Sequence, residues 1–483
     1  MRELSEKNDV VHIRAKTWFT GIIAGFLFTW TLIPFGGPIY IADSVAYYKG
    51  GNAAVEFVTS KFNQTSVAPR PAEPQSINGG EVKNDNAVVA KPAAQVAEAT
   101  GIRSIAYSVI AYLLGAPGGT MLLLAIGQGL LVGIVFAAFL ECFAVQTYRS
   151  WGVAAVILAI CTPLSFVSVF LVPDIFTGML IVALLALGVA VQRMSTSLRL
   201  LFVASAALAV STHASHPPLA AVVTLFCIIS RIYRGERKAA HLVWLVAPLL
   251  LGVAGTLVAN RIGFGETSLA AKRYPLTLAR SISDGPARWH LERHCKEIKY
   301  TVCEVFPEGI PKDVSSFLFS SEGLENRATP AQMDAIRAEE ATIVLAAARE
   351  YPLAELSRLA SNFLRQLVAV QPYLEFNQAV EFNSAGIPAL VSHGNEALPL
   401  WTTWIQTLTL ITAGFSLLWL ISRWNKMDVV SRQATLILLM ALLANAAICV
   451  FFSGIAGRYQ ARVIWVLPLL ALALHRRYTH SEP

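Results

Sequence analysis

Long apolar runs with few or no charges recur along the 483-residue chain, and most are long enough to cross a lipid bilayer as helices. A spanning helix needs roughly 20 such residues. Because the bilayer core offers no water to backbone groups, spanning segments must be helices or strands of a closed barrel, and unbroken runs favour helices. Only 14% of the residues are charged, whereas soluble domains carry about a quarter. The sequence therefore predicts an all-α polytopic membrane protein.

About ten transmembrane helices are expected. The first charged-then-apolar stretch, Arg14 to Ile41, is too long for a cleaved signal peptide and has no small-residue cleavage site, so we expect it to remain as the first span. The predicted spans are 17–41, 119–145, 151–172, 175–191, 199–214, 217–231, 240–262, 399–421, 433–454 and 462–475.

The distribution of Lys and Arg predicts the orientation of these spans. Basic residues gather in the connections that the count places in the cytoplasm, such as 231–238. The short outer connections around Asp174 and His216 contain none. By the positive-inside rule both termini are cytoplasmic and the large loops lie outside. The net charge of +7 thus follows from topology, and no nucleic-acid partner is expected.

Two outer segments are large. The first contains a Pro-, Ala-, Asn- and Gly-rich stretch at 65–101, predicted to be a disordered insert, and the short apolar segment 102–115, predicted to be an interfacial helix. The second is expected to form a small, mostly helical cap, with helices at 331–350 and 353–371. The predicted division is 1–41 for the N-terminus and first span, 42–118 for the first outer loop, 119–262 for spans two to seven, 263–398 for the cap, and 399–483 for the last three spans and the tail.

The six cysteines fall into two groups. Four of them, at 142, 161, 227 and 449, lie in or beside spans and are expected to pack there. Cys295 and Cys303 lie in the large outer loop, where an oxidising compartment favours a disulfide over two unpaired thiols.

Two carboxylates lie at the predicted outer surface, where an ionisable group at the membrane is a functional candidate. Asp43 follows the first span in IYIADSVAYY, and Asp174 lies in the short turn FLVPDIFTG. The simpler interpretation of Asp43 is a residue that ends a helix at the membrane edge. For Asp174 it is an N-cap of the next span.

Histidines and arginines lie on the same side. His213 and His216 are three residues apart in STHASHPPLA, a spacing that would place two metal ligands or two phosphate donors on one helix face; water-facing interfacial histidines are the alternative. Arg458 and Arg462, in GRYQARVIWVLPLL with Tyr459 between them, depart from the positive-inside pattern. Their planar donors suit phosphate oxygens, although they could also extend to lipid head groups. The cluster Lys272, Arg273 and Arg280 is expected to be a solvated or head-group-facing surface.

This arrangement resembles the GT-C class of integral membrane glycosyltransferases. In that class an acidic residue follows the first span, as in IADSVAYY, and a second opens the next outer loop, as in LVPDIFTG. The chain departs from the paired acidic motif of many members, since Ser44 follows Asp43, which leaves the requirement for a divalent cation open.

The resemblance implies a bacterial inner-membrane enzyme with periplasmic loops. Its donor would be a polyprenyl-phosphate-linked sugar, and its acceptor a cell-envelope glycan or lipid. Asp43 would be the general base, assisted by Asp174. Arg458 and Arg462, with Tyr459, His213 and His216, would bind the donor phosphate and sugar. The alternatives are a transporter or flippase for a lipid-linked sugar, an O-antigen-polymerase-like protein, and a non-catalytic scaffold.

Overall fold

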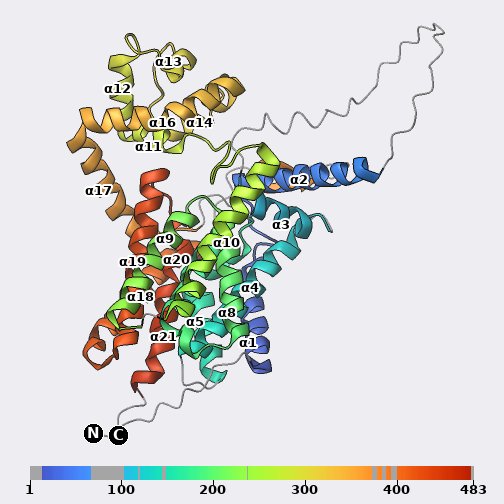
Figure 1. Cartoon of the computed structure of the whole chain (residues 1–483), viewed down its shortest axis with the longest axis vertical. Helices are drawn as coiled ribbons and strands as arrows, with labels where there is room; N and C mark the ends of the chain where they lie inside the picture. The colour runs from blue at the N-terminus through green and yellow to red at the C-terminus, as the bar shows by residue number, and fades with distance from the viewer. Residues whose placement is uncertain are drawn as a thin grey trace, which may run out of the picture.

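A computed structural model of the chain describes residues 14–66, 103–117, 120–143, 148–236, 238–372, 378–382, 388–392 and 400–479. These residues form a bundle of long helices and a smaller helical cap on one end of the bundle (Figure 1). Strand β1 (Gln378–Phe382) pairs antiparallel with β2 (Pro388–Ser392). The other named elements in the described ranges are helical, as the long apolar runs predict.

Six helices of the bundle are long and apolar enough to cross a membrane, judged by length and composition. At a rise of 1.5 Å per residue, roughly 20 residues match a hydrocarbon core about 30 Å thick. This is the architecture of a helical membrane protein. The six are α4 (Leu122–Phe143), α7 (Asp174–Ala190, extended by the 3-10 helix η3, Val191–Arg193), α9 (His216–Tyr233), α10 (Ala239–Phe264), α18 (Leu400–Ser422) and α19 (Val429–Phe452).

The expected count of about ten spans is not confirmed, because the other four predicted spans are short or interrupted helices. The clearest interruption is at Pro163, which has no backbone N–H to continue a helix. The elements in these four segments are α1 (Ala15–Leu27) with the 3-10 helix η1 (Trp30–Leu32), α5 (Tyr148–Cys161) with α6 (Leu164–Val169), α8 (Thr196–Thr212), and α20 (Arg458–Ile464) with α21 (Val466–Thr479).

Helix α1 packs against α4 through glycines. Gly21 and Gly25 of α1 lie against Gly129 and Gly133 of α4, and a Cβ atom added to Gly133 would lie only 2.2 Å from the Gly21 carbonyl oxygen. Small residues at such contacts let two helix backbones approach closely. This contact fixes α1 to the bundle although the helix has only 13 residues.

Helix α7 is the centre of the bundle. Nearly every residue from Asp174 to Ala190 is buried, and α7 contacts α4, α8, α9, α19 and α20. A helix that is apolar on all sides is stable only where other helices or lipid surround it. Because α7 is enclosed by protein, its first residue lies where several other helix ends meet.

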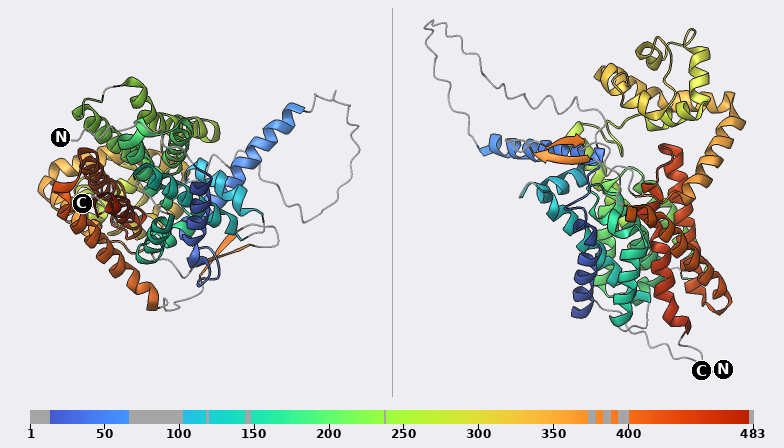
Figure 2. Two further views of the ribbon diagram at one scale, coloured as in Figure 1. Left: turned by 90° about the horizontal axis from the view of Figure 1, so that it is seen from below. Right: turned by 180° about the vertical axis from the view of Figure 1, so that it is seen from behind.

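The first outer segment departs from the expected loop. Residues Ala42–Ser66 form a helix, α2, which lies across the cap end of the bundle and extends beyond its side (Figures 1 and 2). The predicted interfacial segment contains α3 (Ile105–Gly115), which packs against α2, with the Tyr47 and Tyr107 rings 4.8 Å apart. Residues 67–102, which include most of the predicted disordered insert, lie outside the described residues.

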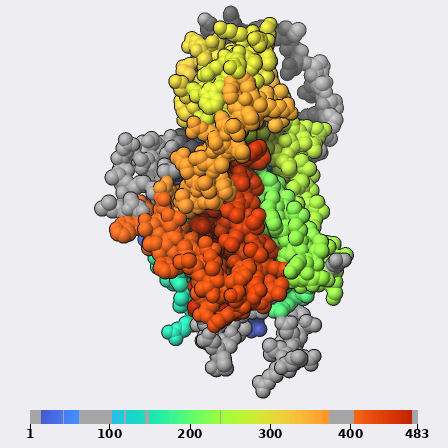
Figure 3. Space-filling view, turned by 90° about the vertical axis from the view of Figure 1, so that its left-hand side faces the viewer, coloured from blue at the N-terminus to red at the C-terminus, as the bar shows by residue number. Residues whose placement is uncertain are grey.

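The cap has a hydrophobic core of its own, which includes Leu278, Leu291, Phe317 and Ile343. In Figure 3 it stands on the bundle as a separate rounded body. Its two longest predicted helices are present as α16 and α17. The cap helices are α11 (Leu276–Asp284), α12 (Pro286–His294), α13 (Thr301–Val305), α14 (Val314–Leu318), α15 (Leu324–Arg327) and α16 (Pro330–Glu350), and α17 (Pro352–Val368) leads back to the bundle.

Helix α17 is joined to its neighbours by its polar side. Glu355 accepts a 2.6 Å hydrogen bond from Arg280 Nη1 of α11, and Gln366 exchanges two 2.9 Å hydrogen bonds with the backbone of Ala456. The apolar side chains of Leu353 and Leu356 are exposed. The buried Arg280 is therefore a structural residue, and the prediction that it belongs to a solvated basic surface is wrong.

The end of the bundle opposite the cap carries basic residues, among them Arg234. Arg234, at the end of α9, donates a 2.8 Å hydrogen bond to Gln433 near the start of α19. The 3-10 helix η4 (Trp424–Lys426) lies in the connection between α18 and α19. Helix α1 begins and α21 ends at this same end (Figure 1).

Candidate functional site

A cavity of about 360 Å³ lies at the cap end of the bundle. Its wall is built from the start of α2, the start of α3 and the residues before it, and the turn between α8 and α9. The end of α10, the connection from α10 to α11, the end of α19 and the start of α20 complete it. The charged residues of the wall are Asp43, Arg103, Arg273 and Arg458, and apolar residues such as Ile105, Val210, Leu269, Ile448 and Phe452 complete it. The cavity therefore combines an apolar lining with three cations and one carboxylate.

Asp43 lies between two arginines from distant parts of the chain. Arg103 Nη2 donates to Asp43 Oδ1, and Arg458 Nη2 lies 3.3 Å from the other oxygen, Oδ2. About a quarter or less of each of the three side chains is exposed, so the cluster can be reached from the cavity. Sequence reasoning brought Asp43 and Arg458 to the same side of the membrane, and the structure places them in contact.

Local folding sets the positions of these three groups. Asp43 lies in the first turn of α2, where the helix dipole favours negative charge. Ser104 caps α3 by accepting from Tyr107 N, and its hydroxyl donates a 2.6 Å hydrogen bond to the Ser211 carbonyl oxygen of α8. This contact holds Arg103, the preceding residue, beside the α8–α9 turn.

The electrostatic environment keeps Asp43 ionised. Burial raises the pKa of its carboxyl, but the charges and hydrogen bonds of Arg103 and Arg458 outweigh this effect, so that the pKa lies below the ordinary value of 3.8. At neutral pH Asp43 is a carboxylate, which can accept a hydrogen bond or a proton from a hydroxyl group.

Asp174 and Arg462 form a second ion pair, which does not line the cavity. Arg462 Nη1 lies 3.1 Å from Asp174 Oδ1, and the two side chains are 0% and 5% exposed. Arg462 Nη2 also contacts Asn445 Oδ1 at 3.0 Å and Ser215 Oγ at 3.2 Å. Asp174 opens α7 without a side-chain capping bond, so the N-cap interpretation is wrong. Both residues position the helix ends behind the cavity.

His213 and His216 do not share a helix face, contrary to the spacing argument. His213 follows the last residue of α8 with extended backbone angles, and His216 is the first residue of α9. His216 is fully buried, with Nε2 2.7 Å from Thr177 Oγ1 and Nδ1 2.6 Å from the Ala209 carbonyl oxygen. Both of its ring nitrogens are used inside the protein, so the two histidines are not a ready pair of metal ligands.

His213 lines the cavity. Its Nδ1 accepts a 3.1 Å hydrogen bond from the Ser215 backbone N–H. In a neutral ring the proton is then on Nε2, which is a donor on the other side of the ring. His213 thus remains a candidate donor to a ligand, whereas His216 is a packing residue.

Tyr459 also lines the cavity, and it lies between the two arginines of the last turn. The guanidinium carbons of Arg458 and Arg462 are 5.6 and 5.2 Å from the centre of its ring. Such contacts orient guanidinium groups. The Tyr459 hydroxyl is hydrogen-bonded to Ser453 Oγ at 2.9 Å, so both the ring and its hydroxyl group are in contact with fixed neighbours.

Sequence reasoning missed two cavity residues. Arg103 lies at the start of the predicted interfacial helix. A single cation beside this apolar segment, on the same predicted side of the membrane as Asp43, could have indicated that it belongs to the site. Arg273 was assigned to a solvated surface, but it lines the cavity and donates a 2.5 Å hydrogen bond to Glu340 of α16. Lys272 beside it pairs with Asp334 at 2.9 Å.

The described part of the cavity wall has no ligand set for a divalent cation. It brings no three His, Cys, Asp or Glu side chains within reach of one ion, and the Asp43 oxygens contact guanidinium groups. Comparison of the chain with protein-family models, curated proteins and solved structures finds no match in any of the three. Its function therefore has to be inferred from the chemistry of this cavity.

Proposed function

We propose that the chain is a GT-C-like membrane glycosyltransferase that moves a sugar from a polyprenyl-phosphate donor to a cell-envelope glycan or lipid. The observation that carries this proposal is the contact of Asp43 with Arg103 and Arg458 in a cavity that also has apolar walls. Such a cavity suits a ligand with an anionic head and a hydrocarbon chain. The cap end of the bundle then faces the periplasm.

The arginines would bind the donor phosphate. Guanidinium groups present fixed pairs of donors that match phosphate oxygens. Arg103 and Arg458 already point to one place, the Asp43 carboxylate, and a phosphate in the cavity would compete with Asp43 for them. As the two arginines turn to the phosphate, Asp43 loses the contacts that lower its basicity. Donor binding would thus make Asp43 a stronger base.

The transfer step is a substitution at the anomeric carbon. The acceptor hydroxyl oxygen forms a bond to that carbon while the bond from the carbon to the phosphate oxygen breaks. The proton of the hydroxyl passes to Asp43, and the electron pair leaves with the polyprenyl phosphate. Arg103 and Arg458 would stabilise the charge that develops on the departing phosphate. Asp43 then releases its proton to water.

This proposal changes two roles that the sequence predicted. Asp174 and Arg462 are almost completely buried behind the cavity, so we assign them to positioning the helix ends and not to contact with the substrate. His216 joins them as a packing residue, whereas His213 and Tyr459 keep a candidate donor-binding role because they line the cavity.

The test compares Asp43→Asn with Glu56→Gln, a matched amide substitution at an exposed position of the same helix. Each purified protein is reconstituted in liposomes with labelled polyprenyl-phosphate sugars and an envelope lipid extract, and the release of polyprenyl phosphate is measured. We expect release by the wild type and by Glu56→Gln, and a loss of at least about 100-fold in Asp43→Asn. Equal release by both variants would remove Asp43 as the base.

A lipid-linked-sugar transporter is the competing function. Transport sites usually lie near the middle of the membrane between discontinuous helices, whereas the charged groups here line a cavity formed by helix ends and the connections between helices. The liposome assay separates the two functions. Movement of intact donor across the bilayer without release of polyprenyl phosphate would support transport and contradict the transferase.

A further inference from the structure

Three side chains of the cap converge at a point away from the cavity. His290 and His294 are one turn apart on α12, and Glu350 is the last residue of α16. His290 Nδ1 lies 2.7 Å and His294 Nε2 lies 3.2 Å from the same Glu350 oxygen, Oε2. The potential ligand atoms all lie within 4.8 Å of one another, and they form the one such group found in the described ranges.

We propose that His290, His294 and Glu350 bind a divalent metal ion, with Zn²⁺ as the preferred ion. Two imidazoles and a carboxylate are a common Zn²⁺ ligand set, and imidazole favours late first-row metals over Mg²⁺ or Ca²⁺. With metal–ligand distances of about 2.0–2.1 Å, ligand atoms of a tetrahedral site lie about 3.3 Å apart. The two oxygen–nitrogen distances of 2.7 and 3.2 Å would open slightly, and the two imidazole nitrogens, which lie within 4.8 Å of each other, would take the same spacing. A water molecule would be the fourth ligand.

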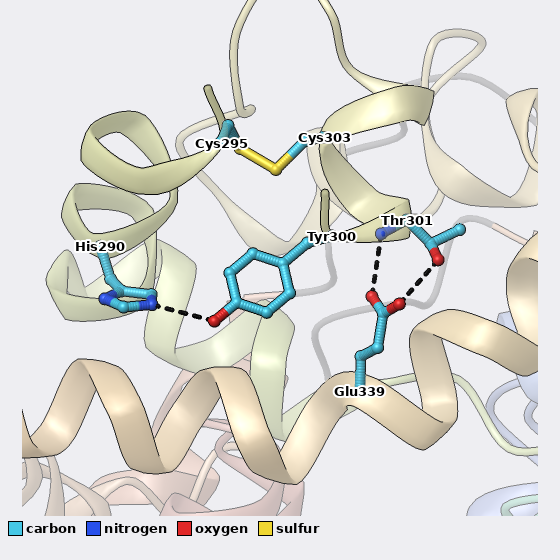
Figure 4. Close-up of a disulfide and its surroundings, with 6 residues drawn as sticks. All are labelled: His290, Cys295, Tyr300, Thr301, Cys303 and Glu339. Atoms are coloured by element: carbon cyan, nitrogen blue, oxygen red, sulfur yellow. Dashed lines mark hydrogen bonds between the residues drawn. A yellow bond between two sulfur atoms is a disulfide. The ribbon is translucent and has the colours of Figure 1, made fainter. Parts of the chain in front are cut away.

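Each of the two histidines has a polar oxygen near its second ring nitrogen. His290 Nε2 lies 3.4 Å from the Tyr300 hydroxyl, a contact drawn in Figure 4. His294 Nδ1 lies 3.7 Å from Glu297 Oε2. Metal-binding histidines usually hold their second ring nitrogen against a hydrogen-bonding oxygen, which fixes the tautomer and the orientation of the ring. The Tyr300 hydroxyl has this position beside His290, whereas Glu297 is an exposed carboxylate beyond hydrogen-bond distance of His294.

Arg293 fixes the orientation of the Glu350 carboxylate, because its Nη1 donates a 2.7 Å hydrogen bond to the other carboxylate oxygen, Oε1. This bond leaves Oε2 as the oxygen that contacts both histidines. Arg293 brings a positive charge near the proposed ion, and Glu297 brings a negative charge on the opposite side of His294. With both imidazoles neutral, the charges of Glu350, Arg293 and Glu297 sum to −1, which offsets half of the charge of a divalent ion.

A disulfide and a pair of hydrogen bonds fix the chain segment that follows α12. Cys295, directly after α12, forms a disulfide with Cys303. Between them, the backbone N–H and hydroxyl of Thr301 donate to the Glu339 carboxylate of α16 at 2.9 and 2.8 Å (Figure 4). These bonds hold Tyr300 against His290. A bound ion would fasten the end of α12 to the end of α16, which is a structural role in the cap.

The experiment uses the full-length protein, purified in detergent without chelators and with an affinity tag that contains no histidine. Metal content per chain is measured by mass spectrometry, and the stripped protein is then titrated with ZnCl₂ against a fluorescent chelator. The variants are His294→Gln and Glu350→Gln at the ligands, Glu297→Gln behind His294, and Glu308→Gln as an exposed acidic control in the cap. His294 is chosen over the more deeply buried His290 because a change there disturbs the core less.

We expect one Zn²⁺ per chain in the wild type and in Glu308→Gln. His294→Gln and Glu350→Gln should lose saturable binding, whereas Glu297→Gln should weaken it by less than about 10-fold because Glu297 makes no hydrogen bond to His294. Zn²⁺ should raise the unfolding temperature of the stripped wild type but not that of His294→Gln. Absence of saturable binding to the wild type, or equal binding by His294→Gln, Glu350→Gln and the control, would show a hydrogen-bonded cluster without a metal and overturn the proposal.

Discussion

The buried Asp174–Arg462 pair offers the sharpest test of how the cavity is supported. Arg462→Met keeps most of the side-chain volume but removes the cation that contacts Asp174 at 3.1 Å. The second Asp174 oxygen, Oδ2, is buried and has no hydrogen-bond partner. The substitution would therefore leave a buried carboxylate with neither charge compensation nor a replacement donor.

The burial of the pair determines how much unfolding free energy Arg462→Met should lose. Removing one partner of a buried ion pair costs about 3–5 kcal/mol of unfolding free energy, because the remaining charge is unpaired in a medium of low polarity. At 1.4 kcal/mol per factor of ten, this is a loss of about two to three and a half powers of ten in the folding equilibrium constant. Arg365→Met, at an exposed arginine of α17, should cost less than about 1 kcal/mol.

The decisive variant combines Arg462→Met with Asp174→Asn. Asp174→Asn should destabilise the wild type, but it should stabilise the Arg462→Met protein because it removes the unpaired charge. Unfolding can be followed by tryptophan fluorescence as SDS is added to protein in mixed micelles. Two results would contradict a stabilising ion pair between Asp174 and Arg462. One is that the changes in unfolding free energy of the two substitutions are additive, and the other is that Arg462→Met lowers this free energy no more than Arg365→Met does.

Two further predictions concern the cavity and the cap. Arg103→Ala removes one of the cations that lower the pKa of Asp43 in the free protein. This pKa should rise, and the acid limb of the pH dependence of kcat/KM for donor cleavage should move to higher pH; an unchanged limb together with unchanged donor binding would contradict the contact. Replacing Cys295 and Cys303 by serine opens a bridge between residues eight apart, which should cost about 2–3 kcal/mol and speed proteolysis of the cap under non-reducing conditions. Cap proteolysis at the wild-type rate would show that the disulfide does not stabilise this unit.

Some features of this protein followed from local sequence alone. The membrane class depends on run length and charge content, which need no tertiary contact. Helices α16 and α17 agree with the predicted ranges 331–350 and 353–371 to within a few residues, because their periodicity and their Pro starts are local signals. The count of about ten spans is not confirmed, because hydropathy does not show where an apolar run contains a break, such as the one at Pro163 between α5 and α6.

The tertiary structure alone decided which charged residues share the cavity. Asp43 and Arg458 are 415 residues apart, and Arg103 meets them only because Ser104 is bonded to α8. Asp174 and Arg462 are also charged residues at the ends of predicted spans. Because α7 is buried on all sides, however, this pair is enclosed by protein. Helix α17 is a second example. Its Glu355 is buried and pairs with the buried cation Arg280, whereas its Leu353 is exposed. Sequence determined the side of the membrane on which these groups are expected, and helix packing determined which of them a substrate could reach.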